Sequence, residues 1–300
     1  GGTVWALSSE DLQDKFDVLV IDEAGQMSLA NLMIISRCAK SILLVGDQQQ
    51  LSQPSRAEHL YDAGLSSLEY WLSKKAIVPE NLGVFLNTSW RMHPKITSIV
   101  SDLFYESKLF GYQKNDLNKI LWIDNFKSSN GNYIPENGVH FEVINHENNS
   151  QESEEEIRKI IEIIDQLHKS HFQYQAENSI NKNKITKNEI IVIAPYNKQV
   201  QKLKESLYDK ANVSTVDKFQ GREAAVAIYS LTSSSGNDAP RGLNFLLEPN
   251  RLNVAISRAK CLSIIVGSGS LLSSSVNSLK DAELINNICR INYINNKNKI

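Results

Sequence analysis

Two short apolar runs near the start of the chain constrain its fold most strongly. Residues 16–21 read FDVLVI and residues 41–45 read SILLV, so each run is almost continuously apolar and rich in branched side chains. Such runs are typical of parallel strands covered by helices on both faces. Residues 28–40 between them have helical periodicity, which predicts a βαβ unit and hence a doubly wound α/β fold. Similar runs predict further buried strands at 139–144, 189–194, 226–231 and 262–266.

Polar residues follow both of the first two runs. Asp22 and Glu23 come directly after the first, and Gly46-Asp47-Gln48-Gln49-Gln50 follows the second. In open α/β sheets, ligands bind at the carboxyl ends of the strands. An aspartate there can hold Mg²⁺, and a neighbouring glutamate can polarise an attacking water. The Gln50 amide could contact a γ-phosphate. Each pattern taken alone is equally compatible with an ordinary polar turn.

Residues 248–260, EPNRLNVAISRAK, predict a helix between two buried strands. A helix would place Arg251 and Arg258 seven residues apart on one face. Guanidinium groups bind phosphate bidentately and stay charged, so the pair suits a polyphosphate. A solvated basic helix face is the alternative interpretation.

Two further segments combine charge with special backbone or aromatic residues. Arg91 lies in WRMHP, where it offers a cation beside an aromatic residue or simply stacks on Trp90 at the surface. Residues 214–223, STVDKFQGRE, contain Gly221, which allows the backbone to approach a ligand closely. By itself this second segment could be a capped turn.

Other segments are less informative about function. Helices are expected at 95–109, from the acidic stretch 150–156 through 168, and at 281–290. The acidic stretch is interpreted as a helix start, with a metal site as the alternative. Residues 111–137 are expected to be irregular and residues 173–187 to form an exposed loop.

The overall composition limits the partners. Lysine and arginine number 32 and aspartate and glutamate 34, so the formal net charge is −2 and any nucleic-acid site must be a local groove. The three cysteines show no metal-binding spacing, which predicts a reducing, cytoplasmic location. No apolar run is long enough to cross a membrane, so no membrane partner is expected.

Taken together, five segments in order resemble the later motifs of superfamily 1 helicases. DEAG resembles motif II, GDQQQL motif III, WRMHP motif IV, TVDKFQGRE motif V, and RLNVAISRAK motif VI. The resemblance covers about residues 3–270. The RMHP and FQGRE forms resemble the Upf-like (1B) branch. The segments VIDEAGQ, SWRMHP, VDKFQGREA and NRLNVAISRAK are most similar to the helicase region of bacterial proteins with an N-terminal RecB-like nuclease domain.

The resemblance implies two RecA-like domains, doubly wound around parallel sheets, with ATP and Mg²⁺ in the cleft between them. Residues 1–84 would be the C-terminal part of the first domain, truncated at its N-terminus, and residues 85–300 the second domain. The resemblance further implies a role for each motif residue. Asp22 would hold Mg²⁺, Glu23 would activate water, Gln50, Arg91 and Arg258 would contact the γ-phosphate, and Gly221 and Glu223 would lie near the nucleotide. Single-stranded nucleic acid, DNA rather than RNA, would contact Thr3, Pro195, Tyr196 and Thr215, with movement from 5′ to 3′.

The chain departs from the family pattern at one place. No G-x-x-x-x-G-K-[ST] phosphate loop occurs in the 300 residues. The family has that loop upstream of motif II, so we expect this chain to be the C-terminal fragment of a helicase, inactive as an ATPase alone. The missing segment would carry the phosphate loop and could include a RecB-like nuclease domain. A truncated, non-catalytic module that binds nucleic acid or another partner remains the alternative.

Overall fold

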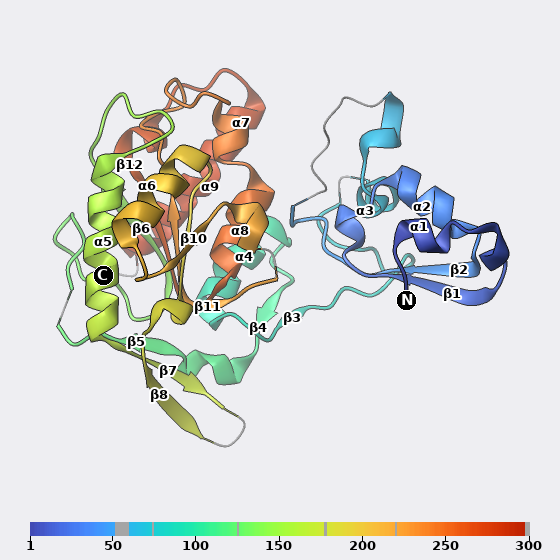
Figure 1. Cartoon of the computed structure of the whole chain (residues 1–300). Coiled ribbons are helices and arrows are strands. Elements are labelled where there is room, and N and C mark those ends of the chain that lie inside the picture. Colours follow the sequence, from blue (N-terminus) through green and yellow to red (C-terminus); the bar gives the residue numbers. More distant parts are fainter. Residues whose placement is uncertain (52–59, 74, 125, 177–178, 220, 298–300) are drawn as a thin grey trace. The chain divides into compact units, whose positions relative to one another are not determined.

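The computed structural model describes residues 1–51, 60–73, 75–124, 126–176, 179–219 and 221–297. The chain divides into two compact units, Gly1–Phe85 and Leu86–Ile300 (Figure 1). Among the described residues, no helix combines the length and apolar character needed to span a bilayer.

The first unit contains the predicted βαβ arrangement. Strands β1 (Phe16–Ile21) and β2 (Ala39–Leu44) pair in parallel, with Phe16 opposite Ala39 and Ile21 opposite Leu44. Helix α2 (Leu29–Ser36) connects them, and its N-cap Ser28 accepts a hydrogen bond from the Asn31 amide. The parallel pairing predicted from the apolar runs is therefore confirmed. The unit also holds α1 (Val4–Leu7) and α3 (Ser67–Leu72).

The two faces of this small sheet differ in burial. Leu19 and Ile21 point into a core shared with α2 and α3. The opposite face presents apolar side chains that are 40–59% exposed, namely Phe16, Val18, Val20, Leu43 and Val45. The apolar runs predicted cover on both faces. Within the described residues the helices of this unit pack on one face only, and the other face stays open.

The second unit is built on a five-stranded, wholly parallel sheet in the order β10-β9-β11-β12-β6. The strands are β6 (Gly138–Ile144), β9 (Ile190–Ile193), β10 (Asn212–Ser214), β11 (Ala224–Ser230) and β12 (Ala259–Ser268). Four of these strands were predicted from the sequence. The fifth, β10, is only three residues long and lies at the edge of the sheet. The central strand β11 is buried along its whole length.

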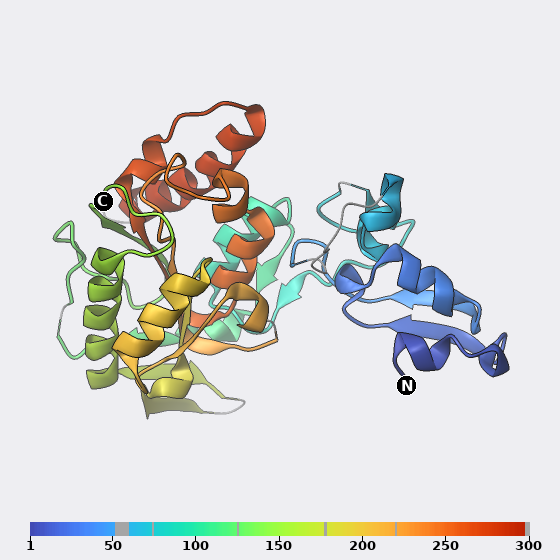
Figure 2. The same ribbon diagram turned by 45° about the horizontal axis from the view of Figure 1, so that its top comes forward.

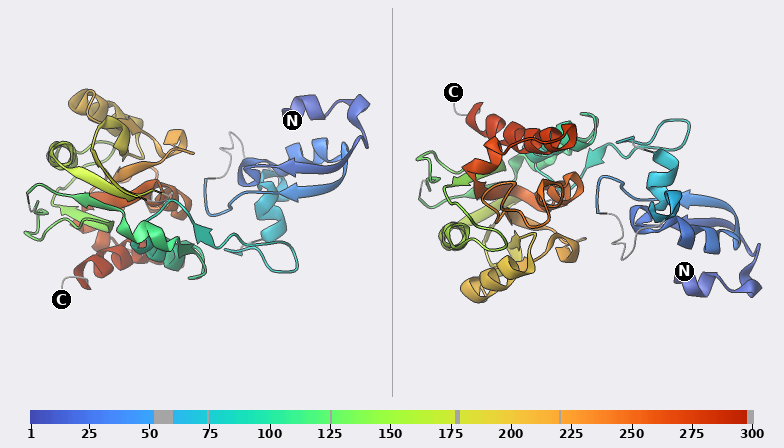
Figure 3. Two further views of the ribbon diagram at one scale, coloured as in Figure 1. Left: turned by 90° about the horizontal axis from the view of Figure 1, so that it is seen from below. Right: turned by 90° about the horizontal axis from the view of Figure 1, so that it is seen from above.

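Helices cover both faces of this sheet, as expected for a doubly wound fold (Figures 2 and 3). On one face α5 (Glu154–Lys169) and α6 (Asn197–Leu207) pack into the main core. On the other face lie α4 (Pro94–Phe104), α8 (Pro249–Ser257) and α9 (Leu279–Lys297). The short helix α7 (Leu243–Leu246) and the strands β3 (Thr88–Ser89) and β4 (Phe110–Gly111) complete the framework.

One prediction for the second unit is wrong. Residues 173–187 were expected to be an exposed loop, but β7 (His171–Gln175) and β8 (Ile180–Lys184) form an antiparallel pair that β5 (Lys119–Leu121) joins. Phe172 is buried in the main core and stacks on Tyr174 with ring centroids 5.2 Å apart. These two aromatic residues anchor strands that are otherwise polar.

The acidic stretch was interpreted correctly as a helix start. Helix α5 begins at Glu154, its N-cap Ser153 accepts from the Glu156 amide, and three glutamates occupy the first turn. Negative side chains there complement the positive end of the helix dipole. Helix α9 is longer than predicted and continues to Lys297.

Candidate functional site

The two acidic turns of the first unit lie side by side at the carboxyl edge of its sheet. The Ala24 amide, directly after Asp22-Glu23, donates to the Val45 carbonyl at 2.9 Å. A Cβ on Gly25 would lie 2.8 Å from the Asp47 carbonyl oxygen, and one on Gly46 would lie 2.8 Å from the Ala24 nitrogen. Only glycine therefore permits this close approach of the two turns.

Both carboxylates of the first turn are exposed to solvent. Glu23 has a left-handed backbone with φ of 52°, and its amide donates to Asp22 Oδ1 at 2.9 Å. Gln26 Nε2 donates to the Glu23 carboxylate at 3.0 Å. Left-handed backbone at a non-glycine residue is costly and is often found at functional sites. In the second turn, Gln50 Nε2 donates to Asp47 Oδ2 at 3.0 Å.

The ligand chemistry of this edge fits Mg²⁺. No group of three histidine, cysteine, aspartate or glutamate side chains converges anywhere in the described parts of the chain. Mg²⁺ does not need such a group, because it is usually held by one or two carboxylates together with water and substrate phosphates. An exposed Asp22 at a strand end meets that requirement.

Thr3, the remaining predicted residue of this unit, is exposed and serves as the N-cap of α1. Its hydroxyl accepts a hydrogen bond from the Ala6 amide at 3.3 Å.

In the second unit, residues from three motifs gather where β11 and β12 begin. Glu223 immediately precedes β11, and Lys260 is the second residue of β12. Arg91 Nε donates to the Glu223 carboxylate at 2.7 Å, and Lys260 Nζ lies 2.6 Å from its other oxygen. Arg91 Nη1 also donates to the Ser257 carbonyl at 3.4 Å, across 166 residues of sequence.

The environment of Glu223 shows what this cluster can bind. Partial burial would raise the pKa of the carboxyl group, but hydrogen bonds from Lys260 and Arg91 outweigh that effect and lower the pKa. The group is therefore a carboxylate held between two cations. A cluster that holds one oxyanion in this way has the charge and the donors to hold a phosphate oxygen.

Arg258 is placed differently from Arg91. Only 2% of it is exposed, and Nε donates to the Val254 carbonyl at 3.2 Å while Nη1 donates to the Arg222 carbonyl at 3.3 Å. It is the C-cap of α8, directly after Ser257. Arg251 lies on the helix itself, with Nε 2.9 Å from Glu248 and Nη1 3.8 Å from Asp217. The helix was predicted correctly, but its two arginines contact different groups rather than forming one pair.

Gly221 and His93 belong to the same two motifs as Glu223 and Arg91. Gly221 has φ of 77° and open space where a Cβ would be, so the turn before β11 is accessible. Its neighbour at position 220 lies outside the described residues. His93 is fully buried and caps α4 by accepting from the Lys95 amide at 3.0 Å, which is a structural role.

The predicted nucleic-acid residues of this unit lie at the other end of the strands, their carboxyl ends. Pro195 and Tyr196 follow the carboxyl end of β9, and Thr215 follows β10. Tyr196 is 6% exposed, its hydroxyl lies 3.4 Å from Ser233 Oγ, and burial raises its pKa. The nucleic-acid candidates thus lie near the carboxyl ends of the strands, and the phosphate candidates lie near the amino ends of β11 and β12.

Aromatic side chains lie beside both groups of candidate residues. Trp90 is 70% exposed and lies against Tyr112, with ring centroids 4.3 Å apart, next to Arg91 in the chain. Arg241 lies over the ring of Phe245, which in turn packs against Tyr196. The motif WRMHP drew attention to the first pair, whereas no sequence signal marked the second.

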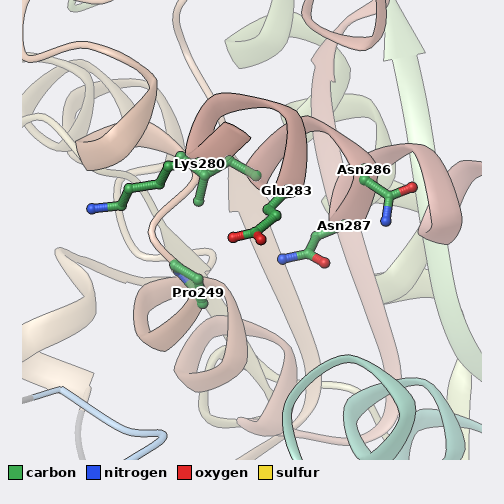
Figure 4. Close-up of a pocket in the computed structure, with 6 residues that line it drawn as sticks. Pro249, Lys280, Glu283, Asn286 and Asn287 are labelled. Carbon is green, nitrogen blue, oxygen red and sulfur yellow. The ribbon is translucent and has the colours of Figure 1, made fainter. Parts of the chain in front are cut away.

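A pocket of about 300 Å³ lies between the start of α8 and helix α9 (Figure 4). It is lined by Pro249, Lys280, Glu283, Leu284, Asn286 and Asn287. It contains none of the predicted site residues.

Comparison with known proteins identifies the family of the chain. A family model described as an AAA domain matches residues 65–270, which is more than half of the chain, and another with the same description matches residues 2–53. A probable helicase of Arabidopsis thaliana, MAGATAMA 3, is 28% identical over 92% of this chain and 33% of its own length.

Two other relatives have a similar sequence identity. The DNA replication ATP-dependent helicase/nuclease dna2 of Schizosaccharomyces pombe is 30% identical over 87% of this chain and 19% of its own length. Regulator of nonsense transcripts 1 of Dictyostelium discoideum is likewise 30% identical over 87% of the chain and 19% of its length. The chain thus spans between about a fifth and a third of these relatives. It belongs to the AAA-domain family, among the homologues of Upf1-like superfamily 1 helicases.

Proposed function

We propose that this chain supplies hydrolytic and strand-binding residues to an ATP-dependent helicase that moves on single-stranded DNA. The observation that carries the proposal is the cluster at the amino ends of β11 and β12. There Arg91 and Lys260 hold the Glu223 carboxylate at 2.7 and 2.6 Å. Cations from separate motifs around one oxyanion are what phosphoryl transfer requires, because its catalysis depends on positioning and charge neutralisation.

Within this proposal each residue has a defined task. Asp22 holds Mg²⁺, and Glu23 orients a water molecule and accepts its proton. Gln50 donates a hydrogen bond to a phosphate oxygen, while Arg91 and Arg258 neutralise charge that develops on the phosphoryl group. Gly221 and Glu223 lie beside the nucleotide. Bound Mg·ATP supplies the phosphoanhydride bond whose cleavage drives movement.

The exposed indole of Trp90 extends the same site. An aromatic face beside a phosphate-binding arginine suits a nucleobase, since bases stack on aromatic rings without regard to sequence. The neighbouring Tyr112 ring holds the indole from one side, at a centroid distance of 4.3 Å.

Strand contact is assigned to the carboxyl edge of the second unit and to Thr3 of the first. Pro195, Tyr196 and Thr215 would contact the backbone of the strand. DNA is the proposed substrate and 5′ to 3′ the proposed direction. The relative named as a DNA helicase/nuclease supports the choice of DNA. It also supports a nuclease domain as a partner in the same polypeptide.

ATP hydrolysis stimulated by single strands tests the first part. We expect hydrolysis only in a polypeptide that also carries a G-x-x-x-x-G-K-[ST] loop, because the 300 residues contain none. In that polypeptide Arg91→Ala should reduce turnover by roughly 10³-fold or more, the range of an arginine finger. Arg158→Ala removes the same charge from the exposed surface of α5 and should leave turnover unchanged. Equal turnover in the Arg91 and Arg158 variants would contradict the proposal.

Arg258→Ala is a less direct test than Arg91→Ala, because the Arg258 side chain is buried. Its loss removes a hydrogen-bond donor from the Val254 and Arg222 carbonyls, so reduced turnover could reflect unfolding. We expect Arg258→Lys to retain the fold, as judged by its melting temperature, and still to lose most turnover. The reason is that a lysine cannot replace a planar fork.

A matched pair of oligonucleotides tests the substrate. We expect the chain to bind single-stranded DNA more tightly than RNA of the same length, and a loop-containing form to displace a duplex with a 5′ tail. A non-catalytic strand-binding module is the second candidate. Strand binding without hydrolysis, even in a polypeptide with an intact loop, would favour that candidate.

A further inference from the structure

The segment between β11 and α8 carries an exposed arginine stacked on an aromatic ring. Arg241 Cζ lies 3.7 Å from the centroid of the Phe245 ring, well inside the range of a cation–π contact. Within the described parts of the chain, no acidic side chain forms an ion pair with Arg241. It is therefore a positioned cation whose charge has not been neutralised.

A second arginine on the same ring provides an internal contrast. Arg251 Cζ lies 4.5 Å from the Phe245 centroid, but this guanidinium group is paired with Glu248 at 2.9 Å and faces Asp217 at 3.8 Å. It is also largely buried, since its side chain is 18% exposed. Arg251 thus secures the ring within the protein, whereas Arg241 faces solvent.

The ring itself is fixed to the carboxyl edge of the sheet. Its centroid lies 5.6 Å from that of Tyr196, whose hydroxyl lies 3.4 Å from Ser233 Oγ. Ser233 donates in turn to the Ser150 carbonyl at 2.7 Å. Arg241 is therefore attached through packed rings and hydrogen bonds to the same edge that carries Tyr196 and Thr215.

We propose that Arg241, oriented by Phe245, binds a backbone phosphate of single-stranded nucleic acid at this edge. The inference rests on the strand-binding role proposed above and extends it to a residue that no motif marked. Stacking fixes the plane of the guanidinium group, so less side-chain freedom is lost when it binds phosphate. Its N–H groups bind phosphate oxygens bidentately and without regard to sequence.

Fluorescence anisotropy with a labelled oligothymidylate of about 12 nucleotides tests the inference on the 300-residue chain. We expect Arg241→Ala to weaken binding about tenfold, as for loss of a hydrogen-bonded charge. Between about 50 and 200 mM salt, the slope of log K against log salt should become shallower by about 0.7, the value for one phosphate contact on a single strand. Arg241→Lys should keep the wild-type slope while losing about threefold in affinity, since it retains the charge but not the planar stack.

Controls separate this inference from the proposed function. Arg158→Ala carries the same change in net charge on α5 and should bind like the wild type. Equal weakening by Arg158→Ala and Arg241→Ala would overturn the inference, because a general charge effect would then explain both. Normal binding and slope in Arg241→Ala, with weakened binding in Thr215→Ala, would overturn the inference and leave the strand-binding role intact. Failure of the wild-type chain to bind at any salt concentration would overturn both.

Discussion

The buried carboxylate of Glu156 holds the turn that follows the central strand, and its removal should be severe. Glu156 is fully buried at the third position of α5. Its carboxylate accepts from the Thr232 amide at 2.9 and 3.0 Å, from Ser230 Oγ at 2.5 Å, and lies 3.0 Å from His146 Nε2. Thr232 has φ of 73°, a strained value for a branched residue, so this turn needs external support.

The magnitude follows from the number of groups left without a partner. Glu156→Ala would leave the Thr232 amide, the Ser230 hydroxyl and His146 without this acceptor, at about 1–3 kcal/mol for each buried donor. We therefore expect the free energy of unfolding to fall by about 3–9 kcal/mol, a large part of the total for an ordinary domain. Glu156→Gln keeps one oxygen and the shape of the side chain, so its effect should be about 1–2 kcal/mol.

Urea unfolding combined with hydrogen exchange measures both effects. Peptides spanning the end of β11 should exchange faster in Glu156→Ala than in the wild type, because the Thr232 amide has lost its acceptor. Glu205→Gln, an exposed change on α6, should stay within about 0.5 kcal/mol of wild type. A Glu156→Ala variant within about 1 kcal/mol of wild type, with unchanged exchange at this turn, would refute the reasoning.

Two further predictions concern a buried carboxylate and a glycine at the close approach of two turns. Burial would raise the pKa of Glu142, but hydrogen bonds from His140, Ser128 and Ser129 lower it to about 2. The carboxylate therefore adds about 3 kcal/mol to the free energy of unfolding above about pH 4.5, and this contribution is lost as the pH falls towards 2. Urea unfolding at a series of pH values should show a smaller loss of stability at acid pH in Glu142→Gln than in the wild type. Gly25→Ala would place a Cβ 2.8 Å from a backbone oxygen of the second acidic turn. Thermal unfolding should show a loss of about 1–3 kcal/mol.

Strand runs and helix starts were predictable because their signals are local. The runs at 16–21 and 226–231 are apolar and rich in branched side chains, and the helical periodicity of residues 28–40 predicted the parallel pairing of β1 with β2. The start of α5 was equally clear from its glutamates. The hairpin of β7 and β8 was missed because its strands are mostly polar. Their order depends on Phe172 in the core and on β5, about 50 residues earlier in the chain.

The environments of the site residues could not be read from the sequence. Arg91 and Arg258 are both arginines in marked motifs, yet one is partly exposed beside Glu223 and the other is enclosed by backbone carbonyls. That difference depends on contacts across more than a hundred residues, which local patterns do not encode. Arg241 and Phe245 were invisible for the same reason, since nothing near them in the chain suggests a ligand.

The carboxyl-end rule predicted where the acidic residues of the first unit lie along the chain, but it gave no prediction for the arginine cluster of the second. Asp22 follows the end of β1, whereas Glu223 precedes β11, and the strand-binding candidates lie at that strand's opposite edge. With seven residues, β11 spans roughly 23 Å at about 3.3 Å per residue. A strand buried along its whole length cannot bend locally without opening voids. If the proposed roles hold, the phosphate contacts and the strand contacts lie at opposite ends of this one buried strand, and direct contact between the two ligands is not needed.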